Sequence, residues 1–482
     1  CLPKTAWPPT SIALTEEEAA NAPEGMDMID MMGMPNMKFS IAVSAYDCTG
    51  CGSCANVCPG KKGEKALVMG NMEANAGKQD FFNYGTELPI KPEVVAKFKE
   101  TTVKGSQFKQ PLLEFSGACA GCGETPYAKL ITQLFGDRMY IANATGCSSI
   151  WGNSSPSTPY TVNPQGRGPA WSNSLFEDNA EFGYGMLLAQ NTIRERLKAS
   201  VEKLAENGVN DDVKAAAQEY LDTFSVGATN GTATDKLVKA LEDCDCGCAE
   251  RAELLKNKDF LAKKSQWIFG GDGWAYDIGF GGVDHVLASG QDINIMVFDT
   301  EVYSNTGGQS SKATKTGATA QFAAGGKETK KKDLAGIAMS YGYVYVAQIA
   351  MGADFNQTVK AIAEAEAYPG PSLIIAYAPC INHGIKKGMS KAQTEEQLAV
   401  ECGYWNNFRF NPEAEKKFTL DSKEPKGDYQ EFLNGEVRYN ALMRANPEKA
   451  QRLFAQNEAE AMERYEYLKG LVNLYDGTAK ED

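Results

Sequence analysis

A glycine-rich turn between a strand-length apolar run and a helix-like segment is the strongest constraint on the fold of this chain. The apolar run is Gln266–Phe269, the turn is Gly270–Gly279 (GGDGWAYDIG), and helix-like sequence runs from Ile278 to Leu287. Glycines let the backbone approach an anion, and a helix N-terminus offers unpaired N–H groups and a positive dipole. The strand, turn and helix therefore predict a phosphate-binding site in an α/β domain.

A carboxylate within this turn predicts a divalent metal beside the phosphates. Asp272 can hold a metal that bridges two phosphate groups. The next strand, Ile293–Asp299, ends where Thr300 and Asn305 could complete the metal shell. A Gly-Asp-Gly turn alone is weak evidence, because tight turns of this composition occur in many α/β proteins for backbone reasons.

Four cysteines near the N-terminus follow a spacing typical of iron–sulfur proteins. Cys48, Cys51, Cys54 and Cys58 form the run C-x2-C-x2-C-x3-C-P, and the chain has 13 cysteines in all. Thiolates at this spacing favour a 4Fe–4S cluster over structural zinc, since no histidine accompanies them. In two-cluster ferredoxins the last cysteine of each run binds the other cluster, so Cys58 is expected to serve a second one. The pattern indicates a reducing compartment.

The matching cysteine run of a second cluster is not found upstream. Cys1 could be its last cysteine, but Leu2 follows where the motif expects proline. The strand-like Phe39–Val43 leads into the run, as in a bacterial-ferredoxin-like α+β module. We therefore assign residues 1–110 to such a module, incomplete at its N-terminus, with the polar stretch 64–109 as a linker.

Strand and helix signals alternate through the rest of the chain. Apolar runs at Val344–Ile349 and Ser372–Tyr377 flank the helix-like Phe355–Ala365, which predicts a mostly parallel sheet with cofactor loops at its carboxyl edge. The Ser- and Asn-rich stretch 152–185 is expected to be a loop that builds part of a site. The predicted α/β domain spans residues 111–482, with a helical insertion at 194–264 and a helical C-terminal tail.

The turn and the segment Thr300–Asn305 together resemble the thiamine-diphosphate motif. The wider stretches Gly270–Lys312 and Tyr377–Lys386 are similar to the pyruvate:ferredoxin (flavodoxin) oxidoreductase family, which implies thiamine diphosphate, Mg²⁺ and 4Fe–4S clusters as cofactors. The resemblance places Mg²⁺ on Asp272, Thr300 and the backbone carbonyl of Val302, and gives Asn305 a catalytic role. The implied cofactor contacts are Glu124, Cys147, Gly271, Asp272, Gly273, Trp274, Thr300, Glu301, Val302, Tyr303, Ser304 and Asn305.

The same resemblance gives a role to four scattered cysteines. Cys119 and Cys122 form a C-x-x-C that by itself could be a redox dithiol or half of a zinc site. Cys147 and Cys380 by themselves would be interpreted as buried free thiols. Cysteines at these four positions match the ligands of the cluster nearest to thiamine diphosphate in the family, and we expect the same role here.

Other candidate residues keep a structural interpretation. Cys244, Cys246 and Cys248 are too close in sequence to wrap one cubane easily, so loop cysteines are the preferred interpretation over an extra metal site. His285 is expected to be an ordinary core or surface residue of a helix. His383, three residues past Cys380, could support that ligand from behind.

The resemblance implies oxidative decarboxylation of pyruvate to acetyl-CoA and carbon dioxide, with one-electron transfer through the clusters to ferredoxin or flavodoxin. A 2-oxoglutarate or indolepyruvate ferredoxin oxidoreductase, or a plain electron carrier, remain alternatives. The net charge of −14 disfavours nucleic acid as a partner. No apolar run approaches the roughly 18 residues that a membrane span needs, and a cytoplasmic protein is expected.

Activation of thiamine requires a further carboxylate. In thiamine enzymes the glutamate that pairs with the aminopyrimidine ring comes from a second α/β domain, for which 482 residues leave no room. The resemblance also covers essentially all of this chain but only the C-terminal part of the family's polypeptide. We therefore expect the chain to need the missing N-terminal portion, to act in a homodimer, and to be inactive alone.

Overall fold

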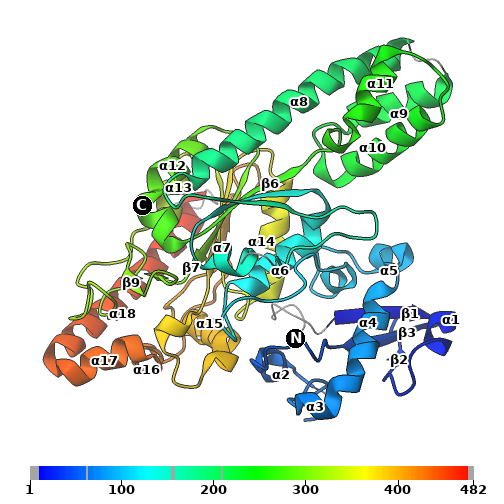
Figure 1. The fold of residues 1–482 in the computed structure, drawn as a ribbon. Helices are drawn as coiled ribbons and strands as arrows, with labels where there is room; N and C mark the ends of the chain where they lie inside the picture. Colours follow the sequence, from blue (N-terminus) through cyan, green and yellow to red (C-terminus); the bar gives the residue numbers. More distant parts are fainter. Residues whose placement is uncertain (1–9, 61–62, 154–157, 208–209, 476–482) are drawn as a thin grey trace.

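The computed structural model describes residues 10–60, 63–153, 158–207 and 210–475 (Figure 1). Its N-terminal part is an antiparallel sheet in the order β1-β3-β2, followed by short helices. This arrangement agrees with the predicted ferredoxin-like module, and α2 carries part of the cysteine run. The elements are β1 (Thr10–Thr15), α1 (Glu16–Ala20), β2 (Ile29–Asp30), β3 (Met37–Ala42) and α2 (Ser53–Val57).

The stretch 64–109 is not the simple linker that its polar composition suggested. It contains α3 (Met72–Asn75), α4 (Gln79–Glu87) and α5 (Pro92–Lys97). Phe82 of α4 is buried against β1, and Val94 of α5 is buried against Met37 of β3. The polar residues form the solvent faces of short helices, while a few apolar side chains complete the core of the module.

The rest of the chain is built on an eight-stranded sheet in the order β13-β12-β10-β11-β7-β6-β4-β5. The six strands from β10 to β5 are parallel, and β12 and β13 extend the sheet antiparallel at one edge. The predicted mostly parallel α/β fold is therefore confirmed. The strands are β4 (Met139–Ala144), β5 (Ala170–Ser174), β6 (Ser265–Gly271), β7 (Asn294–Asp299), β10 (Tyr345–Ile349), β11 (Ser372–Tyr377), β12 (Phe408–Phe410) and β13 (Phe418–Leu420).

Helices cover both faces of this sheet, each over its own apolar core. One core contains α6 (Thr125–Phe135), α7 (Cys147–Gly152) and α14 (Phe355–Ala367). The other contains the start of α8 (Asn179–Asn207), α12 (Phe280–Ala288), α13 (Leu334–Met339), α15 (Ala392–Glu401), α16 (Tyr429–Asn434), α17 (Val437–Ala445) and α18 (Pro447–Tyr475). Ala461 and Leu468 of α18 belong to the second core, so the C-terminal tail packs on its own domain.

The stretch 152–185 is only partly the loop that its composition predicted. Residues 170–174 form β5, which pairs in parallel with β4 from Tyr140↔Ala170 to Ala144↔Ser174. Asn179 then begins α8, and its Nδ2 donates to the carbonyl of Phe269 at 3.1 Å. A sheet edge can recruit a polar strand because the backbone supplies the hydrogen bonds.

The predicted insertion at 194–264 is helical and has a core of its own. The distal part of α8 packs with α9 (Asp211–Asp222), α10 (Gly227–Glu242) and α11 (Ala249–Lys256). Figure 1 shows this bundle at the far end of α8, away from the sheet. Arg194 of α8 links two segments of the bundle, because its Nε donates to the carbonyl of Leu261 at 3.1 Å. No helix within the described residues is long and apolar enough to span a bilayer.

Candidate functional site

The predicted site segments follow the carboxyl ends of four parallel strands that lie side by side, in the order β11-β7-β6-β4. Cys147 comes after β4, Asp272 after β6, Thr300 after β7 and Cys380 after β11. In open parallel sheets, ligands bind in the crevice outside this edge. The fold therefore gathers four segments that are far apart in the sequence.

The glycines of the turn make room for two aromatic rings. A Cβ at Gly270 would lie 2.3 Å from the ring of Trp274, and one at Gly273 would lie 2.6 Å from the ring of Tyr303. The Trp274 side chain is fully buried and belongs to the core on the α12 face. Residues 273–278 form a π-helical turn, a feature frequent at functional sites. The glycines thus allow the two rings to pack tightly against the backbone at the start of the 273–278 turn.

The three predicted Mg²⁺ ligands lie together. One carboxylate oxygen of Asp272 accepts hydrogen bonds from the backbone N–H and the hydroxyl of Thr300, at 3.1 and 3.0 Å. The Thr300 hydroxyl also lies 3.0 Å from the carbonyl oxygen of Val302, and Ser311 Oγ donates to the other Asp272 oxygen at 2.6 Å. Burial and the nearby Asp299 raise the pKa of Asp272 to about 8. A buried carboxylate, a hydroxyl and a carbonyl are hard oxygen ligands that fit Mg²⁺.

Glu301 turns its carboxylate away from this oxygen group. Its φ of 60° is in the left-handed region, and its side chain is fully buried. One carboxylate oxygen lies 3.2 Å from Lys331 Nζ and the other lies 2.9 Å from Arg438 Nη1. Burial alone would raise the pKa of Glu301, but these two cations hold it well below its usual range. Its predicted cofactor contact is therefore limited to the backbone.

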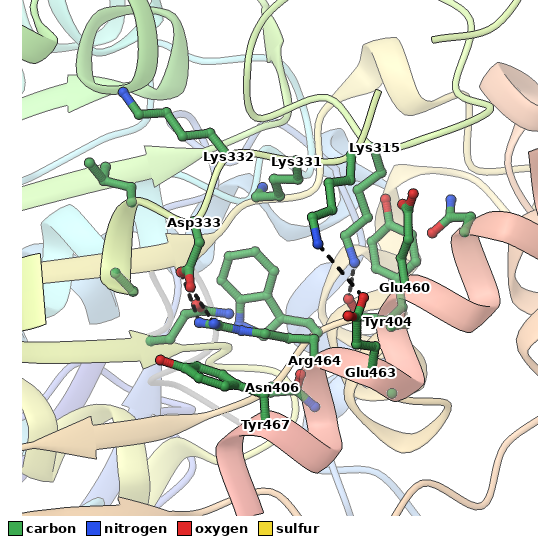
Figure 2. Close-up of a pocket in the computed structure, with 18 of the residues that line it drawn as sticks. Lys315, Lys331, Lys332, Asp333, Tyr404, Asn406, Glu460, Glu463, Arg464 and Tyr467 are labelled. Atoms are coloured by element: carbon green, nitrogen blue, oxygen red, sulfur yellow. Dashed lines mark hydrogen bonds and ion pairs between the residues drawn. The ribbon is translucent and has the colours of Figure 1, made fainter. Parts of the chain in front are cut away.

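The ionic network continues behind the site. Arg438 Nε donates to Glu436 Oε2 at 2.6 Å, and Lys331 Nζ donates to Asp299 Oδ2 at 2.7 Å. A cavity of about 320 Å³ lies beside Lys331, between the 330–335 segment and α18. In Figure 2, Arg464 from α18 reaches Asp333 across this cavity. Lys331 thus contacts the carboxylates of Asp299 and Glu301, the two residues on either side of Thr300.

The four predicted proximal cysteines converge at the same sheet edge. Burial and the neighbouring Glu124, Cys380 and Cys147 raise the pKa of Cys122. The backbone N–H of Gly123 donates to the carbonyl of Pro379 at 3.0 Å, which holds the C-x-x-C loop against the segment of Cys380. Burial, backed by the charges of Glu124 and Cys119, also raises the pKa of Cys380 to about 11. Four thiols held together in this way fit an iron–sulfur cluster.

A direct contact connects these cysteines to the predicted cofactor segment. Cys147 Sγ lies 3.1 Å from the hydroxyl of Ser304, which directly precedes Asn305. Glu124 is buried and accepts a hydrogen bond from Trp151 Nε1 at 2.7 Å, and burial raises its pKa to about 7. Asn305 itself is exposed, and its catalytic role stays a prediction.

His383 fills the space between the two predicted metal sites. The side chain is fully buried, and Nε2 lies 2.7 Å from the carbonyl oxygen of Thr300. The backbone N–H of Cys380 points at its Nδ1 at 3.5 Å. Burial and Arg438 lower the pKa of His383 to about 3, so the ring is neutral. The other histidine, His285, is exposed on α12.

The N-terminal cysteines lie in two different environments, and their division between two clusters stays a prediction. Burial and the thiols of Cys51 and Cys48 raise the pKa of Cys54, so these three lie together. Cys58 is buried elsewhere: burial raises its pKa, but backbone N–H groups of residues 60, 66 and 67 outweigh burial and lower it. Cys1 lies outside the described residues.

The two cysteine sites flank one short segment of the α/β domain. A Cβ at Gly121, which has a φ of 81°, would lie 2.4 Å from the carbonyl oxygen of Met389. A Cβ at Gly52, with a φ of 76°, would touch the Ser390 side chain at 3.4 Å. Asn56 of α2 also donates to the hydroxyl of Thr394 at 3.0 Å. Residues 388–394 therefore separate the predicted proximal cluster from the distal one.

No group of three or more histidine, cysteine, aspartate or glutamate side chains in the described residues could hold a single metal ion. The two proposed sites would be of other kinds. A cubane places its ligand sulfurs around a whole cluster, farther apart than the ligands of one ion. The proposed Mg²⁺ group has only one carboxylate, and its other ligands are a hydroxyl and a carbonyl.

Comparison with known proteins finds relatives that match nearly the whole of this chain. Residues 252–376 match the C-terminal TPP binding domain of thiamine pyrophosphate enzymes. The chain is 55% identical over 473 residues to a pyruvate-flavodoxin oxidoreductase of Enterobacter agglomerans, covering 96% of this chain and 40% of that protein. It is 56% identical over 468 residues to the pyruvate:ferredoxin oxidoreductase of Moorella thermoacetica, covering 94% of this chain and 39% of that protein.

This chain corresponds to a portion of the pyruvate:ferredoxin (flavodoxin) oxidoreductases. The pyruvate-flavodoxin oxidoreductase of Klebsiella pneumoniae gives the same relation, with 53% identity over 95% of this chain and 39% of that protein. The predicted resemblance is thus confirmed, and the chain spans about 40% of the length of the curated relatives that it matches.

Several residues that shape the site were not predicted. Lys331, Glu436 and Arg438 were assigned no role, yet each contacts a predicted site residue or continues the network around it. The Gly-rich stretch with three consecutive lysines, Lys330–Lys332, was a visible signal, because a lysine run beside buried strands can supply counter-charges. Arg438 had no such signal in the sequence.

Proposed function

We propose that this chain forms the thiamine-diphosphate and iron–sulfur portion of an enzyme that oxidatively decarboxylates pyruvate to acetyl-CoA and carbon dioxide. The observation that carries the proposal is the contact of Cys147 Sγ with Ser304 Oγ at 3.1 Å. It links a predicted cluster ligand directly to the predicted cofactor segment. An enzyme that removes electrons at the cofactor segment would need its first electron acceptor at such a place.

The residues of the chain have separate tasks in this proposal. Asp272, Thr300 and the carbonyl of Val302 would hold Mg²⁺ against the diphosphate, and the N–H groups at the start of the 273–278 turn would face the phosphates. Thiamine diphosphate, when bound, supplies the carbanion that attacks the carbonyl of a 2-oxo acid. Glu124 and Trp151 form a buried wall near Cys147, which limits water at the place where the substrate would react.

The cysteines would carry electrons away from that place. Cys119, Cys122, Cys147 and Cys380 would bind the proximal 4Fe–4S cluster, and Cys48, Cys51 and Cys54 a distal one, with Cys58 directed to another. The close approach of both cysteine loops to residues 388–394 supports a short route between them. Ferredoxin or flavodoxin would take the electrons from the N-terminal module.

The proposed partners are pyruvate, coenzyme A, ferredoxin or flavodoxin, the remaining part of such an enzyme and a second copy of this chain. The relatives named for pyruvate support pyruvate as the substrate over 2-oxoglutarate and indolepyruvate. We propose the cytoplasm as the compartment, because low-potential clusters and free thiols require reducing conditions.

The cofactor site is tested with Asp272→Ala, which removes the only carboxylate of the proposed Mg²⁺ site. The variant should lose bound thiamine diphosphate but keep its iron and acid-labile sulfide, since the cysteine sites do not depend on this side chain. Asp284→Ala is the matched control: this carboxylate also belongs to the helical segment after β6, but it accepts from Tyr341 Oη at 2.8 Å. Stoichiometric thiamine diphosphate in the Asp272 variant would overturn the assignment.

Activity distinguishes the proposed reaction from its alternatives. Assembled with the rest of the enzyme, the chain should reduce methyl viologen with pyruvate and coenzyme A, and Asp272→Ala should abolish this reaction. Faster reduction with 2-oxoglutarate or indolepyruvate would change the substrate assignment. Chemical reduction of the clusters without turnover of any 2-oxo acid would indicate an electron carrier.

A further inference from the structure

Three cysteines lie together in the helical insertion, far from the proposed cofactor site. Cys244, Cys246 and Cys248 occupy the loop between α10 and α11, at the far end of α8 in Figure 1. Cys244 is buried in the core of the insertion, whereas Cys246 and Cys248 are half-buried at its edge. The proposed reaction uses none of them.

The distance between two of these thiols distinguishes a shared metal ion from a direct reaction between the two sulfurs. Cys246 Sγ and Cys248 Sγ are 2.9 Å apart. Two cysteine ligands of tetrahedral zinc, each about 2.3 Å from the ion, would be held about 3.8 Å apart. The third thiol lies beside the pair: the Sγ of Cys244 accepts from the backbone N–H of Cys246 at 3.4 Å, but its side chain is buried in the core of the insertion. The geometry therefore suits direct reaction between the two sulfurs better than a shared metal.

The surroundings make Cys246 the nucleophile of the pair. The two thiols share a hydrogen bond in which either can be the donor, and with the backbone N–H of Cys248 and the charge of Arg251 it lowers the pKa of Cys246. The same hydrogen bond raises the pKa of Cys248. A thiolate stabilised in this way and open to solvent attacks disulfides, whereas buried thiols such as Cys244 are inert.

We propose that Cys246 and Cys248 form a thiol–disulfide exchange site whose substrate is a small, solvent-borne disulfide such as oxidised glutathione. Cys246 attacks one sulfur of the small disulfide, forming a mixed disulfide and releasing one thiolate, which takes up the proton of Cys246. Cys248 then loses its proton and attacks the sulfur of Cys246, which forms the Cys246–Cys248 bond and releases the second small thiol. Two protein thiols are oxidised and one small disulfide is reduced, so electrons and protons balance.

The proposed disulfide can be tested directly, because trypsin should release all three cysteines in one peptide, Ala240–Arg251. The chain is incubated anaerobically with oxidised glutathione, its free thiols are alkylated in denaturant so that the buried Cys244 also reacts, and the peptide is analysed without reduction. We expect a peptide that is two hydrogens lighter and carries a single alkyl group, on Cys244. Reduction before alkylation should restore three alkyl groups.

Variants distinguish this pair from the other possible pairings. Cys244→Ser should still form the disulfide, whereas Cys248→Ser should stop at a glutathione adduct on Cys246. Cys246→Ser should react at least tenfold more slowly than the parent, and unchanged circular dichroism and thermal midpoints should show that the variants are folded. Three alkyl groups after oxidation, a bond that includes Cys244, or protection of all three thiols by one equivalent of Zn²⁺ would each overturn the proposal.

Discussion

The guanidinium of Arg438 provides a sharp test of the buried network behind Thr300. Arg438 is 3% exposed, and its Nη1 lies 2.9 Å from Glu301 Oε2. Its Nε donates to Glu436 at 2.6 Å and its Nη2 donates to the hydroxyl of Tyr404 at 3.1 Å. Arg438→Met keeps most of the side-chain volume but removes the only cation that contacts both carboxylates in the described structure.

The expected loss in the free energy of unfolding depends on which partners Glu301 and Glu436 keep in the variant. Removing one partner of a buried ion pair costs about 3–5 kcal/mol. Glu301 keeps Lys331 at 3.2 Å, which puts the expected loss at the lower end, about 3 kcal/mol at pH 8. Glu436 keeps only His383, whose Nδ1 is 3.6 Å away and whose ring is neutral.

Glu436 gives this loss a pH dependence with a defined sign. Burial raises the pKa of Glu436 to about 7, although Arg438 opposes the shift. A carboxyl whose folded pKa lies above its unfolded value of 4.5 loses stabilisation as the pH rises between the two values. Arg438→Met raises the folded pKa further and extends this loss above pH 7. The variant should therefore be less stable relative to the parent at pH 8 than at pH 6, by about 1 kcal/mol.

Urea denaturation followed by circular dichroism at pH 6 and pH 8 measures both quantities. The matched control is Arg464→Met, because Arg464 also makes two contacts with a carboxylate, Asp333, but the two side chains are 25% and 43% exposed. An exposed pair of this kind contributes under about 1 kcal/mol. Adding Glu436→Gln to Arg438→Met should remove the pH-dependent part. An Arg438→Met loss no larger than the control at pH 8 would refute the reasoning.

Three further predictions address other parts of the chain. Cys380→Ser should lose one cluster's worth of iron while the electron paramagnetic resonance signal of the N-terminal cluster persists; full iron retention would end the ligand assignment. Burial lowers the pKa of Lys129 to about 8, so its charge destabilises the fold below pH 8 and less so as the pH approaches 10.5. Lys129→Met should thus stabilise the chain by about 2 kcal/mol at pH 7, with a smaller gain at pH 10, and a lower thermal midpoint at pH 7 would contradict this. Leu237→Ala, in the core of the insertion, should cost about 2–5 kcal/mol without changing the thiamine content, and a parallel loss of cofactor would show that the insertion supports the site.

The strands around the phosphate-type turn could be predicted because their signals are local. Apolar runs of strand length identify β6, which leads into the glycine-rich turn with Asp272, and β7, which ends in Asp299, and both lie as predicted. The polar β5 could not be predicted, because its sequence lacks the apolar pattern of a strand. It becomes a strand by pairing with β4. The same holds for the short antiparallel strands β12 and β13 at the other edge.

The candidate site was predictable in its oxygen and sulfur ligands but not in its charges. Asp272, Thr300 and the pair Cys119 and Cys122 belong to recognisable motifs, whereas only the family resemblance gave a role to Cys147 and Cys380. The structure brings each set together. Glu301 lies within such a motif, yet its left-handed backbone turns the carboxylate inward. The partner that it meets there, Arg438, comes from a different part of the chain, and no pattern near either residue connects them.

Residues of the α/β domain determine where α2 of the N-terminal module packs. Asn56 of α2 is held by Thr394 and Lys391, and Gly52 rests on Ser390, all of which follow the loop of Cys380. Exchange of the module alone between relatives would place a foreign α2 on native contacts and change the distance between the two predicted cluster sites. A working chimera must carry residues 388–394 with the module, so the unit of exchange is discontinuous in the sequence.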